Sequence, residues 1–308
     1  METKNQWKAW IYLGPAALLL LIFTFYPMVN TIGISFLNGY KTTLATAGAD
    51  FAIGVQNYVD VITGNKQFLS GFTNTMLIAF ITVPISTILG LLIAVGLNSI
   101  KPLRSFLQTI YFLPYVTNSV AIGMVFAMIF DKTANNDGLF NMLLHAFGMP
   151  ADSSPTWIAS AVDLFSAQHI RNLFVLCIYS IWNALPFKIL IFMGALQSVN
   201  KQYYDAAKVD GTPQRRVFTK ITVPLISPMV LYVVVTGFIG AFKEYSSVVG
   251  IFGENLRTYN MNTMVGFIYD SMTGQFTGRA AAGAVVLFLV ILLFTGIQFL
   301  VSKKRVHY

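Results

Sequence analysis

The segment DAAKVDGTPQRRVFTKITVPLISP, Asp205 to Pro228, is rich in cations and separates two strongly apolar runs of the chain. Its lysines and arginines cannot lie in hydrocarbon, because each charge at mid-bilayer costs at least about 2.5 kcal/mol. Tyr203 to Val209 contains no helix breaker, and Asp210-Gly211 is typical of a turn. Thr212-Pro213 is typical of an N-cap followed by proline at the first helical position. The pattern predicts two short helices joined by a sharp turn outside the membrane, a rigid surface that another protein can bind.

The composition is that of an integral membrane protein with one domain. Of 308 residues 56% are hydrophobic and 10% are charged, and the mean hydropathy is +0.66. Water-soluble proteins carry about 25% charged residues. The net charge of +8 does not indicate nucleic-acid binding, because the cations flank the apolar runs as membrane topology requires. The single Cys177 excludes a disulfide framework, and the first apolar run is too long for a cleaved signal peptide.

Six stretches are apolar and long enough to cross a membrane, taking about 20 residues per span. They lie near residues 10–37, 72–98, 106–130, 172–196, 223–242 and 280–301. The predicted fold class is all-α, a polytopic bundle of six transmembrane helices in a single domain over residues 1–308. A polar loop, residues 201–224, connects the fourth span to the fifth.

The distribution of positive charge predicts the orientation of these spans. Twelve of the 20 lysines and arginines fall on the side that would hold both termini and the 201–224 loop: Lys4, Lys8, Lys101, Arg104, Lys201, Lys208, Arg215, Arg216, Lys220, Lys303, Lys304 and Arg305. The other side holds six cations and eight of the 12 acidic residues. Because cytoplasmic loops carry the excess of Lys and Arg, both termini and the loop are predicted to be cytoplasmic.

Small and polar residues recur on one face of each predicted helix that flanks the loop. On the fourth span these are Ser180, Asn183, Ala184 and Phe187, and on the fifth Gly237, Gly240, Ala241 and Glu244. Their helical spacing predicts a polar-lined groove that suits sugar hydroxyls and a stacking ring. The alternative is helix packing alone, since Gly, Ala and Ser are favoured wherever membrane helices touch. Lys188 lies off this face, where it would pair with Glu244 or extend to the membrane surface.

The loop also carries a family resemblance. Asp205-Ala206-Ala207, then Gly211, then Ile221-x-Val223-Pro224 resemble the EAA loop of ABC-importer permeases, with Asp205 for the family's glutamate and Val223 for its leucine. Further matches are Leu13-Gly14-Pro15, Tyr26-Pro27, Asn74-Thr75, Phe112-Leu113-Pro114-Tyr115 and Gly138-Leu139-Phe140-Asn141. Nearly the whole chain is therefore similar to the sugar (maltose-type) permeases.

This resemblance implies one transmembrane subunit of a bacterial ABC importer for a carbohydrate. Its partners would be two ATP-binding cassette subunits, a second permease subunit, an extracytoplasmic substrate-binding protein and membrane lipid. The residues carried over to a coupling helix that docks on the ATPase are Asp205, Ala206, Ala207, Asp210 and Gly211. The two small-residue faces would line the transport cavity, and the loop would continue into the fifth span through Ile221–Pro228. The alternative for the loop is an amphipathic helix on anionic lipid.

Motifs of catalysis are absent from the sequence. It contains no G-x-x-x-x-G-K-[ST] phosphate loop, no H-E-x-x-H and no G-x-S-x-G, so neither an enzyme nor a resident cofactor is predicted. His145 and His169, in the external segment 131–171, lack the spacing of metal ligands. An ion-coupled secondary sugar transporter is the alternative function, and it would show inverted repeats and discontinuous helices. A membrane scaffold is a third, without an associated ATPase.

Overall fold

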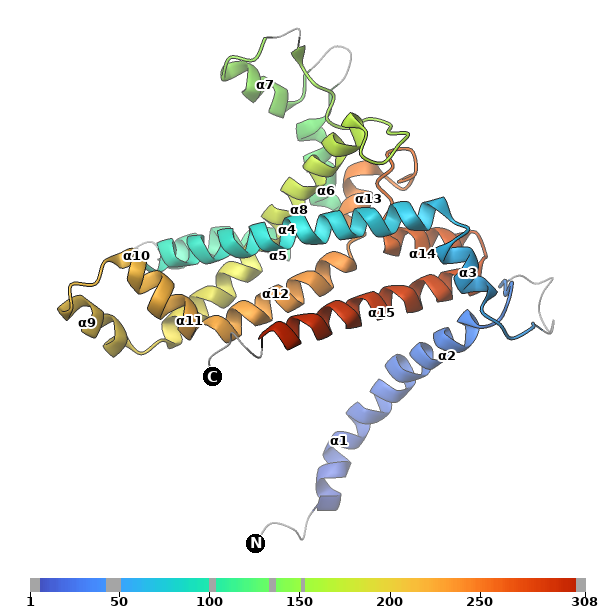
Figure 1. Cartoon of the computed structure of the whole chain (residues 1–308), viewed down its shortest axis with the longest axis horizontal. Coiled ribbons are helices and arrows are strands. Elements are labelled where there is room, and N and C mark those ends of the chain that lie inside the picture. Colours follow the sequence, from blue (N-terminus) through green and yellow to red (C-terminus); the bar gives the residue numbers. More distant parts are fainter. Residues whose placement is uncertain (1–5, 43–50, 100–103, 133–136, 151–152, 303–308) are drawn as a thin grey trace. The chain divides into compact units, whose positions relative to one another are not determined.

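The computed structural model describes residues 6–42, 51–99, 104–132, 137–150 and 153–302 (Figure 1). Within these ranges the chain is helical apart from turns, loops and one isolated β-bridge between Leu37 and Ile53, which confirms the predicted all-α class. The chain divides into two compact units. The first comprises residues up to Phe68 together with Phe267–Leu289, and the second comprises Leu69–Gly266 with the residues from Val290 onward.

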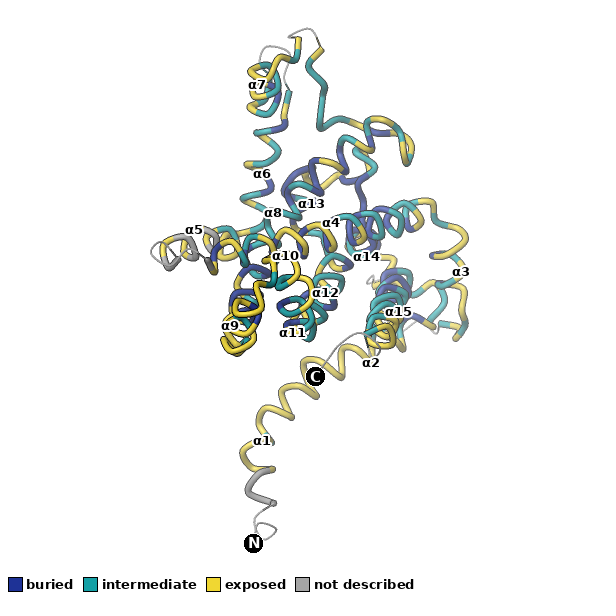
Figure 2. Tube along the Cα trace, turned by 60° about the vertical axis from the view of Figure 1, so that its left-hand side comes forward, coloured by how far each residue is buried: buried dark blue, intermediate teal, exposed yellow. Residues whose placement is uncertain are grey.

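The first unit begins with one long apolar helix. It is built from α1 (Gln6–Leu20), a π-helical segment (Leu21–Phe25) and α2 (Tyr26–Ser35). None of the most apolar part of Trp10–Ser35 is buried within the chain, as the exposed colouring in Figure 2 shows. An apolar surface of this extent requires a cover of lipid or protein.

The rest of the first unit is held by short polar contacts. It contains α3 (Gln56–Ile62), most of α14 (Met264–Thr273) and the first half of α15 (Thr277–Ser302). The buried Asn57 donates from Nδ2 to the carbonyls of Ser35 and Leu37 at 3.0 and 2.8 Å. These bonds satisfy carbonyls at the end of α2 that lack a helical partner.

The second unit is organised around two long helices, α4 (Lys66–Ser99) and α8 (Ala167–Ser198), with α12 (Ser227–Phe242) beside them. Both long helices continue through their prolines, Pro84 and Pro186. The second unit also contains two short helices, α7 (Leu139–Ala146) and α13 (Ser246–Phe252). Buried side chains of α4, α8 and α12, among them Ala94, Phe192 and Val233, form one apolar cluster.

The predicted third span, 106–130, is not one helix. It consists of α5 (Arg104–Val116) and α6 (Ser119–Phe130), separated at Thr117 and Asn118. The Asn118 side chain accepts hydrogen bonds from the backbone N–H groups of Val120 and Ala121, so it caps a new helix. Asparagine is among the strongest N-cap residues, which explains why the helix restarts there.

The predicted fifth span is also interrupted, at Ile226. The segment Gln214–Leu225 and helix Ser227–Phe242 meet at an angle of 69°. Ile226 leaves helical geometry, with φ −95 and ψ 7, and Pro228 has no N–H to restore the hydrogen bond to the Pro224 carbonyl. The prediction that the loop runs continuously into the fifth span is therefore wrong, because a bend separates them.

Within the described residues, four single helices are long and apolar enough to cross a membrane: Trp10–Ser35, Lys66–Asn98, Ala167–Ser198 and Thr277–Ser302. The bent pair at Ile226 raises the number to five. Neither half of the broken third span is long enough alone, so a sixth crossing stays a prediction. Of the cations that predict the orientation, Lys4, Lys101, Lys303, Lys304 and Arg305 lie outside the described residues.

Candidate functional site

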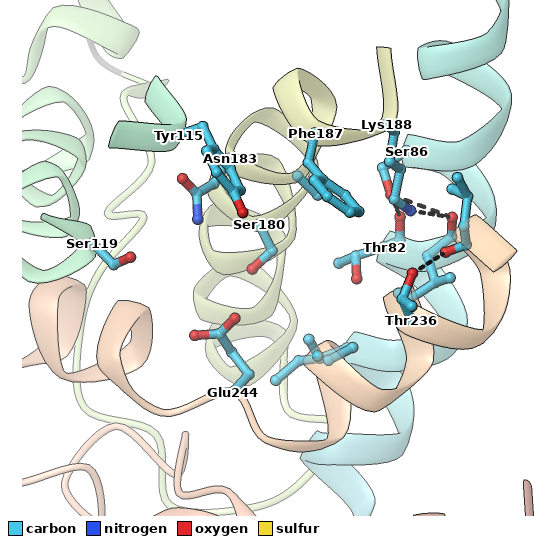
Figure 3. A pocket seen from close by; sticks show the side chains of 17 residues that line it. Thr82, Ser86, Tyr115, Ser119, Ser180, Asn183, Phe187, Lys188, Thr236 and Glu244 are labelled. Atoms are coloured by element: carbon cyan, nitrogen blue, oxygen red, sulfur yellow. Dashed lines mark hydrogen bonds between the residues drawn. The ribbon is translucent and has the colours of Figure 1, made fainter. Parts of the chain in front are cut away.

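A cavity of about 440 Å³ opens in the second unit, between α4, α8 and α12 (Figure 3). All eight residues predicted to share a groove line it. From α8 these are Ser180, Asn183, Ala184 and Phe187, and from α12 and the residues after it Gly237, Gly240, Ala241 and Glu244. Side chains three and four positions apart share a helix face. The stretch before the 201–224 loop therefore forms one wall of the cavity, and the stretch after the loop forms another.

The cavity presents polar atoms with incomplete hydrogen bonding. The buried hydroxyl of Ser180 has no hydrogen-bond partner in the described part of the chain. Glu244 accepts at Oε1 from the hydroxyl and backbone N–H of Ser247, at 2.7 and 3.3 Å. A buried hydroxyl without a partner is costly, so this wall is suited to a ligand that supplies one.

An aromatic pair forms another part of the wall. The rings of Tyr115 on α5 and Phe187 on α8 are stacked, with centroids 5.8 Å apart and planes inclined by 17°. A ligand site typically combines apolar and aromatic surface with a few polar groups that fix orientation. The ring faces and the nearby hydroxyls and carboxylate provide both.

Sequence reasoning missed five polar residues of this cavity: Thr82, Ser86, Tyr115, Ser119 and Thr236. Thr82 and Ser86 are four residues apart in an apolar helix, and that spacing was the available signal. Tyr115 and Ser119 are brought to the cavity by the break between α5 and α6, which the sequence analysis did not anticipate.

The Lys188 side chain does not make the contacts that the sequence predicted for it. The residue is 3% exposed, and its ammonium donates to the Val83 carbonyl (3.2 Å), Ser86 Oγ (2.7 Å) and Thr87 Oγ1 (2.9 Å). It neither pairs with Glu244 nor extends to the membrane surface. One turn of α4 offers three oxygens within reach, and these hold the side chain against α4 instead.

The polar loop forms a helical hairpin. Helix α9 (Lys201–Val209) starts at the N-cap Asn200, whose side chain accepts from the N–H of Gln202. Gly211 has φ +64, a left-handed conformation that only glycine adopts without cost, and the predicted turn is present there. The second helix, α10 (Gln214–Val217), follows the N-cap Pro213, one residue later than predicted. A π-helical segment (Phe218–Thr222) and α11 (Val223–Leu225) complete the connection.

The hairpin exposes part of the predicted docking motif. Asp205, Ala206, Asp210 and Gly211 are exposed, and neighbouring Val209 is 88% exposed. Ala207 is 5% exposed, so the prediction that it allows close approach of a partner is wrong. Its small side chain faces the chain's own interior. The exposed Val209 side chain adds apolar surface next to the two carboxylates.

The sequence also matches a known family. Residues 86–307 match the family model described as the binding-protein-dependent transport system inner membrane component. The chain belongs to this family. Membership decides against the ion-coupled and scaffold alternatives, because the family is a membrane permease of ABC transporters and not an enzyme.

This permease is similar to several named sugar transport proteins. It is 27% identical to the arabinooligosaccharides transport system permease protein AraP of Bacillus subtilis, over 92% of this chain and 84% of that protein. It is 26% identical to the lactose transport system permease protein LacF of Rhizobium radiobacter, over 95% and 92%. It is 27% identical to the multiple sugar-binding transport system permease protein MsmF of Streptococcus mutans, over 97% of both chains.

A solved structure shares the fold of the permease. A chain of a bacterial alginate ABC transporter, crystallised with an alginate pentasaccharide-bound periplasmic protein, superposes with a TM-score of 0.77 at 20% identity. The match covers 98% of this chain and 96% of that one. At this identity the likeness establishes the fold of the permease and not its substrate.

The segment around His145 holds a histidine, a serine and an aspartate together, but not as a catalytic triad. His145 Nε2 lies 2.8 Å from Ser154 Oγ and 3.2 Å from Asp137 Oδ2, while Nδ1 donates to the Met149 carbonyl. A triad needs the carboxylate on one ring nitrogen and the hydroxyl on the other. Among the described residues no group of three His, Cys, Asp or Glu side chains could hold a metal ion.

Proposed function

We propose that this permease translocates a carbohydrate through the cavity between α4, α8 and α12. The observation that carries the proposal is that two helix faces rich in small residues line a single polar and aromatic cavity. One face precedes the hairpin in the sequence and the other follows it. The named relatives that cover nearly all of the chain transport arabinooligosaccharides, lactose and multiple sugars. Sugars present apolar ring faces and many hydroxyls, which the stacked rings and the polar atoms of the wall complement.

ATP hydrolysis by two separate ATP-binding cassette subunits drives the transport cycle. The exposed face of α9 and the turn at Gly211 form the docking surface, with Asp205 as the carboxylate for a cation of the ATPase. Tyr204 and the 5% exposed Thr222 are 3.3 Å apart at their hydroxyls, which links α9 to the segment before the bend. Movement of the hairpin is therefore passed to Ile226, where the 69° bend changes and tilts α12 against the cavity.

The complete importer contains a second permease subunit and an extracytoplasmic binding protein that delivers substrate. The exposed apolar surfaces of α1, α2 and α15 contact the second permease and lipid. With α5 and α6 together forming the third of six crossings, both termini are on one side of the membrane, and the excess of lysine and arginine makes that side the cytoplasm. Reporter fusions at the two termini test this orientation, and a periplasmic signal at either terminus would contradict it.

Transport assays test the cavity. We expect Glu244→Gln to reduce uptake of the delivered oligosaccharide at least about tenfold, in keeping with about 1.5 kcal/mol or more for a hydrogen bond to a charged group. Asn183→Ala should reduce it about two- to tenfold, in keeping with about 0.5 to 1.5 kcal/mol for a neutral hydrogen bond. Lys243→Met is the matched control, because Lys243 is exposed and does not line the cavity. Wild-type uptake by both cavity variants, with normal assembly, would refute the pathway.

Co-purification tests the docking surface. The tagged permease, extracted in mild detergent, is expected to carry an ATPase that Asp205→Lys or Gly211→Pro releases. Gln202→Lys places a lysine at another exposed position of the same helix and is expected to retain the ATPase. Retention by all three variants would show that the ATPase binds elsewhere.

A further inference from the structure

Lys188 carries a positive charge inside the wall of the cavity. The Ser86 hydroxyl donates to the Thr82 carbonyl, and the Thr87 hydroxyl donates to the Val83 carbonyl at 2.6 Å. Each hydroxyl hydrogen is therefore already used, so both hydroxyls accept from Lys188. The Val83 carbonyl can only accept as well. Three acceptors require three N–H donors, and only the ammonium form of lysine provides them.

Among the described residues, no carboxylate neutralises this charge. Lys188 forms no ion pair there, and its three hydrogen-bond partners are uncharged. Hydrogen bonds reduce the cost of burying an ammonium, but its field extends into the cavity. A field inside low-dielectric walls is much stronger than in water.

The surrounding helices are shaped to hold this side chain. A Cβ added at Gly90 of α4 would lie 3.0 Å from Lys188 Cβ. A Cβ added at Gly237 of α12 would lie 3.4 Å from Lys188 Nζ and 3.0 Å from Val83 Cγ1. Two glycines on different helices thus leave the space that the lysine occupies, so the ammonium has a built site.

Among the described residues that line the cavity, Glu244 is the only other charged one. Figure 3 shows the two side chains on different sides of the cavity, with Lys188 beside Ser86 and Glu244 near Ser180. Because Glu244 is hydrogen bonded to Ser247 and forms no ion pair with Lys188, the two charges act separately. The cavity therefore has a positive end and a negative end.

We propose that Lys188 is a specificity-determining residue whose ammonium makes its end of the cavity favour anionic solutes, such as sugar acids, over cationic ones. This inference rests on the proposed pathway, since it concerns what passes through that cavity. Lys188 does not use its N–H groups to grip the substrate, because all three are bonded to α4. Its contribution is the electrostatic field at the position where a substrate's carboxylate would lie.

Thiol modification measures this field directly. The permease has one cysteine, Cys177, so Cys177→Ala with Gly240→Cys gives a single reporter. Gly240 is exposed to the cavity, has nothing within 4 Å of an added Cβ, and lies one turn from both Gly237 and Glu244. The assembled importer is treated with anionic sulfonatoethyl or cationic trimethylammonioethyl methanethiosulfonate, and mass spectrometry of the permease chain gives the two rates.

The ratio of anionic to cationic rate is compared with the same ratio for mercaptoethanol in solution. We expect Lys188→Met and Lys188→Gln to lower the ratio about three- to tenfold, and Glu244→Gln to raise it. Lys243→Met, outside the cavity, should leave it unchanged. The glutamine variant keeps amide donors for α4 and so separates loss of charge from loss of hydrogen bonding.

Two results would overturn the inference. One is an unchanged ratio in both neutral Lys188 variants. The other is a ratio at or below the solution value in the Glu244→Gln protein, which retains Lys188 and decides the question even if the Lys188 variants do not assemble. Failure of both reagents to react at Gly240→Cys would instead refute the water-filled pathway itself.

Discussion

Gly123 of α6 and Gly250 of α13 are in backbone contact. A Cβ at Gly123 would lie 2.8 Å from Gly250 Cα, and a Cβ at Gly250 would lie 3.0 Å from Gly123 Cα and 2.7 Å from the Val120 carbonyl. Such close approach is possible only between residues without side chains. The contact fixes α6, whose first residue, Ser119, faces the cavity and accepts at its carbonyl from the Tyr179 hydroxyl at 3.0 Å.

This contact predicts that Gly250→Ala destabilises the permease. The added methyl group meets backbone atoms that cannot rotate away, so we expect a loss of about 1 to 3 kcal/mol. Thermal unfolding of the purified protein in detergent measures the loss. Gly194→Ala is the matched control, because Gly194 lies in α8, is exposed and has nothing within 4 Å of an added Cβ. Equal unfolding temperatures for the two variants would contradict the backbone contact.

Asn74 predicts a second large effect on stability. Its Nδ2 donates to the carbonyls of Asn260 and Asn262 at 2.8 and 2.9 Å, and its Oδ1 lies 2.9 Å from His169 Nε2. His169 Nδ1 accepts from the Phe165 N–H, so Nε2 carries the hydrogen and donates to Asn74.

We expect Asn74→Ala to cost about 1 to 3 kcal/mol for each buried group left without a partner. The 260–262 loop should then exchange its amide hydrogens faster, which hydrogen-exchange mass spectrometry can measure. Thr73→Ala, one residue earlier, removes only a bond to the Leu69 carbonyl and serves as the control. Unchanged exchange in the Asn74 variant would show that the asparagine does not anchor the loop.

Sequence reasoning succeeded where local chemistry decides structure. The helical hairpin follows from the absence of breakers before Val209 and from the glycine turn, and both groove faces follow from helical spacing. The Asn74-Thr75 pair was noticed only as a family match, although its role is a long-range contact. Thr75 Oγ1 accepts from the distant N–H of Met264, which no local pattern can indicate.

The failures have two physical origins. The break at Asn118 and the bend at Ile226 arise from a local N-cap and a nearby proline, which hydropathy alone does not reveal inside an apolar run. The position of Lys188 depends instead on oxygens of a distant helix. A lysine beside an aromatic residue in an apolar run does not indicate that its ammonium will donate to three oxygens of α4. The prediction for Ala207 failed for a similar reason. The sequence shows which residues share a helix face, but not whether that face points to the chain's interior or to a partner.

Gly211 gives a prediction about coupling. At φ +64 a β-branched residue is strained, whereas asparagine adopts this conformation with little cost. We expect Gly211→Val to weaken ATPase retention and transport at least about fivefold, for a strain of about 1 to 2 kcal/mol, and Gly211→Asn to restore most of both. Two variants with equal activity would show that the turn geometry is not needed for docking.

The segment around His145 is predicted to respond to pH. The hydrogen bond from His145 to the Met149 carbonyl and the contact with Asp137 raise the pKa of the imidazole from its ordinary value of 6.5. The bond from Ser154, together with His145 and Lys132, lowers the pKa of Asp137 from 3.8. Because the pKa of His145 is raised on folding, its protonation stabilises the segment fully below pH 6.5, and that stability is lost as the pH rises through the raised pKa. The lowered aspartate value stabilises the segment above pH 3.8, and that stability is lost on acidification.

Residues 137–150 and 153–157 should therefore be most ordered between pH 3.8 and pH 6.5, and should loosen as the pH rises above 6.5 and His145 loses its proton. Above that pH the neutral His145 Nε2 can only accept, so it competes with Asp137 for the Ser154 hydroxyl and no longer donates to the carboxylate. Hydrogen exchange at about pH 5.5 and pH 8, corrected for the intrinsic rates, measures the change. His145→Gln should abolish the difference between the two conditions, because its amide does not titrate in this range. A difference that persists in this variant would assign the pH response to groups other than His145.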